Sequence, residues 1–130
     1  MNGADVPIVE GGSQRLGVLW YTGAMEKTLP SAYQRFATEH PELIEIYERL
    51  GDETLREGPL DRKSAELVKL GIAIGGRLEG AVHAHVRRAR EAGASAEEIR
   101  HAIRLALTTV GFPTMMSALS WANDVLASNA

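Results

Sequence analysis

The chain has 130 residues, of which 45% are hydrophobic and 24% charged. These values predict one globular domain that is large enough to bury a hydrophobic core. Its net charge of −3 argues against a nucleic-acid partner, because nucleic-acid-binding surfaces usually carry a basic excess. The absence of cysteine excludes disulfides, thiolate zinc sites and cysteine nucleophiles. With neither a secretory signal nor a run of about 18 apolar residues, we expect a cytoplasmic protein without a membrane partner.

Residues 1–30 are predicted to form an apolar N-terminal arm. Their second half, LGVLWYTGAMEKTLP, is apolar, contains glycines and has little helical period. This stretch could be a short strand. It could equally pack on its own domain or lie on a neighbouring subunit, since an apolar arm is most useful in an oligomer.

Residues 31–130 are predicted to form one all-α domain, a compact bundle of about five or six helices. Pro41 suits the first position of one helix, whose apolar residues keep helical spacing. Gly75 and Gly76 should end or kink the next helix, because consecutive glycines weaken helical structure. Gly93 suits the end of a third helix with a basic C-terminal half.

The last two helices carry clear start signals. Ser95 and Glu98 have the spacing of a capping box, and Pro113 can begin the final helix. The helix that follows Ser95 is expected to continue until Gly111. Its buried side is predicted to contain Ile99, Ile103, Ala106, Leu107 and Val110.

The stretch LEGAVHAH places Glu79, His83 and His85 in one small-residue helix. Glu79 and His83 share a face, whereas His83 and His85 point about 200° apart on a regular helix. This disfavours a simple two-histidine metal site, so we expect none unless the helix breaks or another subunit supplies ligands. His85 is either a packed, hydrogen-bonded residue or an acid/base group, because histidine titrates near neutral pH.

Glu66 immediately precedes a strongly apolar helical stretch, from which it could exchange a proton with His85. It could also be an exposed acid paired with a nearby base, an arrangement that stabilises little. The basic run of Arg87, Arg88 and Arg90 is typical of a solvated helix face. One of these arginines could instead hold a substrate carboxylate, which matches the guanidinium fork.

Several stretches together resemble the carboxymuconolactone decarboxylase family, which includes the alkyl hydroperoxidase D-like proteins. They run from PELIEIYERLGDETLREGPLDRKSAELVKLGIAI to HAHVRRAREAGASAEEIRHAIRLALTTVGFPTMMSAL, about two-thirds of the chain. The most recognisable pieces are the His-x-x-x-Ala-x-x-x-Gly run from His85 to Gly93, the EEIRHAI segment and the GFP before the last helix. The resemblance implies an all-α fold that assembles as a homo-oligomer, either a trimer or a hexamer.

The resemblance also implies which chemistry is lost. In the peroxidase branch a glutamate and a histidine activate a Cys-x-x-Cys pair, and Glu66 and His85 fall on those two positions. Leu78 and Ala81 fall on the two cysteine positions. Because thiol activation needs a thiolate, the peroxidase mechanism cannot run in this chain.

The decarboxylase branch, which also lacks the cysteine pair, implies cofactor-free acid/base chemistry on a small carboxylated lactone or organic acid. His85 and Glu66 would be the catalytic residues of this lyase. Arg87 and Arg88 would bind the substrate carboxylate, with His83 as a secondary substrate-binding candidate. Two alternatives are a non-catalytic oligomeric binding or scaffold protein and, less favoured, a peroxidase-like protein that borrows a thiol.

Overall fold

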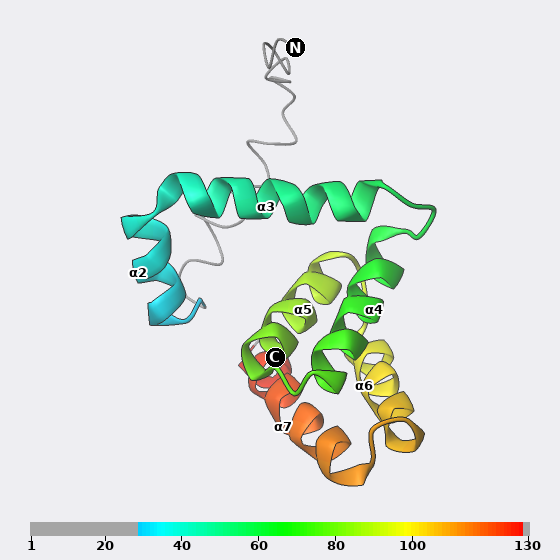
Figure 1. Cartoon of the computed structure of the whole chain (residues 1–130). Helices are drawn as coiled ribbons and strands as arrows, with labels where there is room; N and C mark the ends of the chain where they lie inside the picture. Colours follow the sequence, from blue (N-terminus) through cyan, green and yellow to red (C-terminus); the bar gives the residue numbers. More distant parts are fainter. Residues whose placement is uncertain (1–28, 129–130) are drawn as a thin grey trace. The chain divides into compact units, whose positions relative to one another are not determined.

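The structure, a computed structural model, describes residues 29–128, so the predicted arm lies almost wholly outside the described residues. All regular secondary structure in residues 29–128 is helical, which confirms the all-α prediction (Figure 1). The elements are α2 (Ser31–Glu39), α3 (Pro41–Arg56), α4 (Arg62–Gly75), α5 (Glu79–Glu91), α6 (Ala96–Arg104), the 3₁₀ helix η1 (Leu105–Thr108) and α7 (Phe112–Ser128). The chain divides into two compact units between Glu53 and Thr54, and the predicted boundary at residue 30 stays a prediction.

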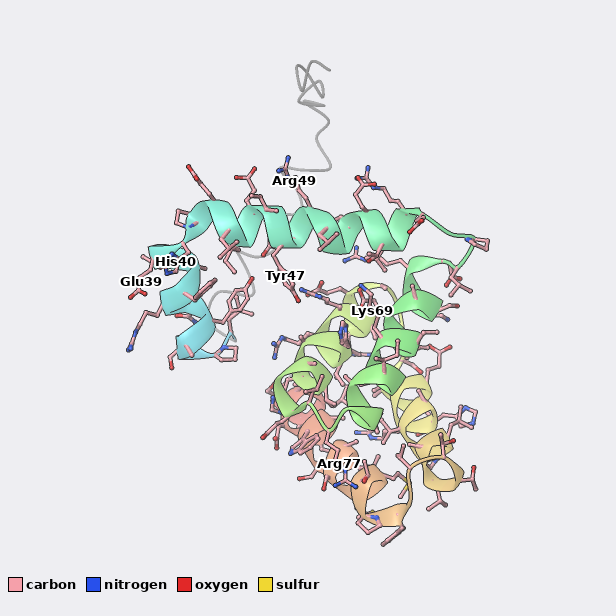
Figure 2. The ribbon with its side chains drawn as sticks, viewed as in Figure 1. Glu39, His40, Tyr47, Arg49, Lys69 and Arg77 are labelled. Atoms are coloured by element: carbon pink, nitrogen blue, oxygen red, sulfur yellow. The ribbon has the colours of Figure 1, made fainter. Side chains whose placement is uncertain are left out.

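The first unit contains α2 and most of α3. The Tyr33 hydroxyl on α2 donates a hydrogen bond of 3.0 Å to Glu48 Oε1 on α3. The rings of Phe36 and His40 lie 4.8 Å apart at the end of α2, where Figure 2 labels His40. Pro41 begins α3 as predicted. The apolar residues of this helix are nevertheless exposed, namely Leu43, Ile46, Tyr47 and Leu50.

Helices α4 and α5 form a hairpin in the second unit. The Asp61 carboxylate caps α4 by accepting a 2.7 Å hydrogen bond from the Ser64 N–H. The helix ends at Gly75, as the sequence predicts. Arg77 then takes the left-handed conformation with φ 55°, and Figure 2 shows it at the turn into α5. This tight turn lays α4 against α5.

The end of α5 and the start of α6 follow the predicted signals. Gly93 has φ 98°, a conformation that favours glycine, and lies just beyond the last turn of α5. The Ser95 hydroxyl accepts the Glu98 N–H at 3.0 Å, and the Glu98 carboxylate accepts the Ser95 N–H at 2.8 Å. Both halves of the predicted capping box are therefore formed.

The prediction of one regular helix from Ser95 to Gly111 is wrong in its last part. The α-helix ends at Arg104, and the chain continues as the tighter η1. A 3₁₀ turn is a common ending of an α-helix, and the β-branched residues Thr108–Val110 that follow favour an α-helix less than unbranched residues do. Leu107, predicted to be buried, is consequently exposed, whereas Ile99 and Ile103 are fully buried as expected.

The core of the second unit lies where α5 contacts α4 on one side and α7 on the other (Figure 1). Pro113 lies in the first turn of α7, as predicted. Among residues 29–128, every helix is too short or too polar to span a membrane. The most deeply buried hydrophobic side chains are Leu70, Ile74, Val82, Val86, Ala89, Ala94, Ile99, Ile103, Ala118 and Ala122.

Candidate active site

The most deeply buried acid in the described part of the chain contacts a histidine on the next helix. Glu66 on α4 is only 1% exposed. Its Oε2 lies 2.9 Å from Nδ1 of His85 on α5, whose side chain is 16% exposed. The structure therefore brings together the two residues that were predicted to be catalytic. A buried carboxylate needs a hydrogen-bond partner of this kind, because leaving it unpaired costs free energy.

The pair has the geometry of an acid/base unit. When Glu66 is ionised, Nδ1–H of His85 donates to it, and the lone pair of the opposite ring nitrogen, Nε2, can accept a proton. The carboxylate then stabilises the resulting imidazolium. Because the His85 side chain is partly exposed, a substrate can approach its ring. The Glu66 side chain is buried and is not accessible to a substrate.

Arg87 and Arg88 are both half-buried, but they do not point in the same direction. Arg88 is three residues after His85 and shares its face of α5, whereas Arg87 is two residues after it and points about 200° away. Of the two predicted carboxylate-binding arginines, Arg88 is therefore the better placed to act together with His85.

Glu91, near the end of α5, interacts electrostatically with Arg88, Arg87 and Glu66. It was not predicted as a site residue from the sequence. Burial raises the pKa of its carboxyl group, while the positive charges of Arg62, Arg88 and Arg87 oppose that rise and the charge of Glu66 adds to it. Glu91 is three residues after Arg88 and four residues after Arg87, and this spacing places an acid beside both arginines on a helix. The spacing is the sequence signal from which Glu91 could have been found.

His83 lies on the other side of α5, towards α7. Its Nε2 is 3.4 Å from Oδ2 of Asp124 on α7, and Glu79 lies beside both residues. Glu66 contacts His85 and not His83. The predicted role of His83 in substrate binding stays a prediction. Asp124 was missed, since forty residues separate it from His83 and no local pattern links them.

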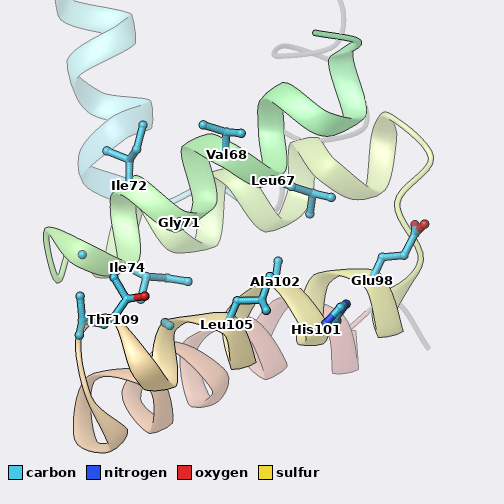
Figure 3. Close-up of a pocket in the computed structure, with 13 residues that line it drawn as sticks. Leu67, Val68, Gly71, Ile72, Ile74, Glu98, His101, Ala102, Leu105 and Thr109 are labelled. Carbon is cyan, nitrogen blue, oxygen red and sulfur yellow. The ribbon is translucent and has the colours of Figure 1, made fainter.

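A separate apolar groove of about 640 Å³ lies between α4 and the α6–η1 segment (Figure 3). Its polar side chains include His101 and Glu98, and neither Glu66 nor His85 lines it. The groove therefore does not provide a cavity for the Glu66–His85 pair. Its apolar lining residues include Leu67, Val68, Ile72, Leu105 and Val110.

Comparison with known proteins identifies the family. The profile of the carboxymuconolactone decarboxylase family matches residues 41–124, well over half of the chain. The chain belongs to the carboxymuconolactone decarboxylase family. An uncharacterized protein from Methanocaldococcus jannaschii is 30% identical over 82 residues, which cover 62% of this chain and 79% of that protein.

A solved structure supports the same fold. The crystal structure of a carboxymuconolactone decarboxylase family protein from Legionella pneumophila, in its apo form, matches with a TM-score of 0.62. The match covers 91% of this chain and 97% of the Legionella chain at 21% identity. At that identity the likeness establishes the fold alone.

The chain is a cysteine-free member of the carboxymuconolactone decarboxylase family. Leu78 and Ala81 stand at the two positions that the resemblance assigns to the cysteine pair. Leu78 immediately precedes α5 and is 55% exposed, while Ala81 packs partly against the core one turn before His85. Neither side chain can ionise or transfer electrons. These two positions therefore supply neither an acid/base group nor a redox group.

Proposed function

We propose that the chain is a cofactor-free acid/base lyase that decarboxylates a small carboxylated lactone or a related organic acid. The observation that carries this proposal is the 2.9 Å contact between a fully buried Glu66 and a partly exposed His85. Membership of the carboxymuconolactone decarboxylase family supports the reaction class. Isomerisation by proton transfer between two carbons would use the same pair.

The proposed reaction breaks the bond between the ring carbon and the carboxylate carbon. CO₂ leaves, the bonding electron pair remains on the substrate, and the adjacent carbonyl system spreads that charge. Protonated His85 then delivers a proton from Nε2 to carbon, and Glu66 holds the ring in place through Nδ1. Solvent returns a proton to Nε2, so the enzyme ends the cycle unchanged.

Arg88 is proposed to hold a carboxylate of the substrate. It is half-buried and shares the His85 face of α5. A charge-assisted hydrogen bond of this kind contributes about 1.5–3 kcal/mol, so Arg88→Ala should raise KM by roughly 10- to 100-fold. Arg87→Ala, a matched change on the other face, should have a much smaller effect.

The experiment that tests the proposal measures CO₂ release from a panel of small carboxylated lactones and keto acids, with no added metal. The native protein is compared with His85→Ala and with a control, His40→Ala, which removes an exposed histidine at the end of α2. Loss of the acid/base group should lower kcat by roughly 100- to 10,000-fold in His85→Ala. His40→Ala should remain within a few-fold of the native rate.

Two outcomes would count against the lyase. An intact His85→Ala variant that turns over a good substrate at the native rate would remove His85 from the chemistry. Absence of turnover on the whole panel would favour a non-catalytic binding or scaffold protein, in which Glu66 and His85 variants change assembly and nothing else.

We also propose that the chain forms a homo-oligomer, either a trimer or a hexamer, in which a second copy covers the apolar groove. Val68, Ile72 and Leu105 line this groove and are 51%, 68% and 62% exposed. Contiguous exposed apolar side chains of this size are characteristic of interaction sites. Ile72→Glu should therefore lower the mass measured by light scattering, whereas an exposed polar change such as Glu97→Gln should not.

A further inference from the structure

The side of α5 that faces α7 carries a cluster of three metal-binding side chains. Glu79 and His83 come from α5 and Asp124 comes from α7. Each residue offers one ligand atom, and these atoms all lie within 4.8 Å of one another. None of the three residues belongs to the Glu66–His85 pair.

His83 supplies the observation that points to a ligand. Its Nε2 is inaccessible to solvent, and no residue among 29–128 forms a hydrogen bond with it. Asp124 Oδ2 lies 3.4 Å away but without hydrogen-bond geometry. A buried ring nitrogen left in this state costs free energy, and a cation would use its lone pair.

The spacing of the three residues suits a cation. Glu79 and His83 are four residues apart, so a single face of α5 presents both. Asp124 comes from a helix that packs directly against α5, which fixes the third ligand from a second element. Metal–ligand bonds of about 2.1 Å place tetrahedral ligands about 3.4 Å apart, which matches the separation of 3.4 Å between His83 Nε2 and Asp124 Oδ2.

We propose that Glu79, His83 and Asp124 together bind one divalent transition-metal ion. Zn²⁺ is the ion used to test the site. One imidazole nitrogen with two carboxylate oxygens is a donor set that zinc accepts, and water would complete the coordination. The two acids are exposed, so their carboxylates can move the short distance needed to close around the ion. Bound metal would link α5 to α7 and stabilise the folded chain.

The test is a calorimetric titration of the full, tag-free chain with Zn²⁺ after treatment with a chelator. The native protein should bind one equivalent. Glu79→Gln and Asp124→Asn should each weaken binding by roughly tenfold or more, and His83→Ala should abolish it. Zn²⁺ should also raise the midpoint of thermal unfolding of the native chain and leave that of His83→Ala unchanged.

The controls are His101→Ala, which removes an exposed histidine of α6, and His85→Ala, which removes the histidine on the opposite side of α5. Both should bind zinc as the native chain does. The proposal fails if the native chain takes up no zinc, if His83→Ala binds as tightly as the native chain, or if either control loses the site. Because the Glu79 and Asp124 side chains are exposed, their amide variants should fold normally and keep the test decisive.

Discussion

The two sides of α5 use the same residue types in different surroundings. His85 contacts Glu66 on the α4 side, and His83 faces Asp124 on the α7 side. The exposed fractions of the histidine side chains are similar, at 16% and 21%. The acids differ strongly, since the Glu66 side chain is 1% exposed and the Asp124 side chain 64%.

The acidic partner of each histidine, rather than the histidine itself, therefore determines the chemistry available on that side of α5. A spacing of two residues separates the rings by about 200°, so one helical turn supplies two independent sites. The buried acid depends on His85 for its hydrogen bond, which couples the pair closely. The exposed Asp124 carboxylate faces solvent and remains available to a cation.

His85→Ala and His83→Ala should differ clearly in their effects on stability. Removing His85 leaves the buried Glu66 carboxyl group without its 2.9 Å partner, so the free energy of unfolding should fall by about 1–3 kcal/mol. Removing His83 should cost less than about 1 kcal/mol, because Asp124 is exposed. Urea denaturation of both variants at neutral pH measures the two losses. Equal losses would show that the burial of the acid does not govern the contrast.

A double-mutant cycle measures directly how strongly each histidine is coupled to its acid. In the pair Glu66→Ala and His85→Ala, the coupling free energy should reach about 0.5–3 kcal/mol, as expected for residues in direct contact. In the pair His83→Ala and Asp124→Ala, measured without metal, it should lie between about 0 and 1 kcal/mol. A larger coupling for the second pair would reverse the assignment of the tightly coupled side.

The sequence predicts the α4 side better than the α7 side, and the reason is physical. Gly75 and Gly93 mark the ends of α4 and α5 in the sequence, so the hairpin and its Glu66–His85 contact follow from local patterns and the family resemblance. Asp124 meets His83 only through the packing of α7, which no local pattern encodes. The end of α6 was missed because a 3₁₀ turn such as η1 is common at a helix terminus and has an apolar spacing close to that of an α-helix.

A third prediction uses the capping box as a reference that belongs to neither side of α5. Ser95→Ala should lower the free energy of unfolding by about 1 kcal/mol, since it removes the acceptor for the Glu98 N–H. The hydrogen bond from the Ser95 N–H holds the pKa of Glu98 below its ordinary value of 4.5. The stabilising contribution of the ionised Glu98 carboxylate should therefore be complete above pH 4.5 and should disappear as the pH falls through the lowered pKa of Glu98. Thermal unfolding at several pH values checks both effects.

The smallest predicted effect concerns Glu91, whose pKa is raised above 4.5 chiefly by burial. Because the unfolded chain releases this proton at a lower pH than the folded chain does, the free energy of unfolding falls as the pH rises from about 4.5 through the raised pKa. Glu91→Gln removes that loss, so the variant should be slightly more stable than the native chain at neutral pH and indistinguishable in this respect below pH 4.5. Denaturation at neutral and acidic pH measures the difference. A variant that is less stable at neutral pH would mean that the attraction to Arg62, Arg88 and Arg87 outweighs the cost of burial on this side of α5.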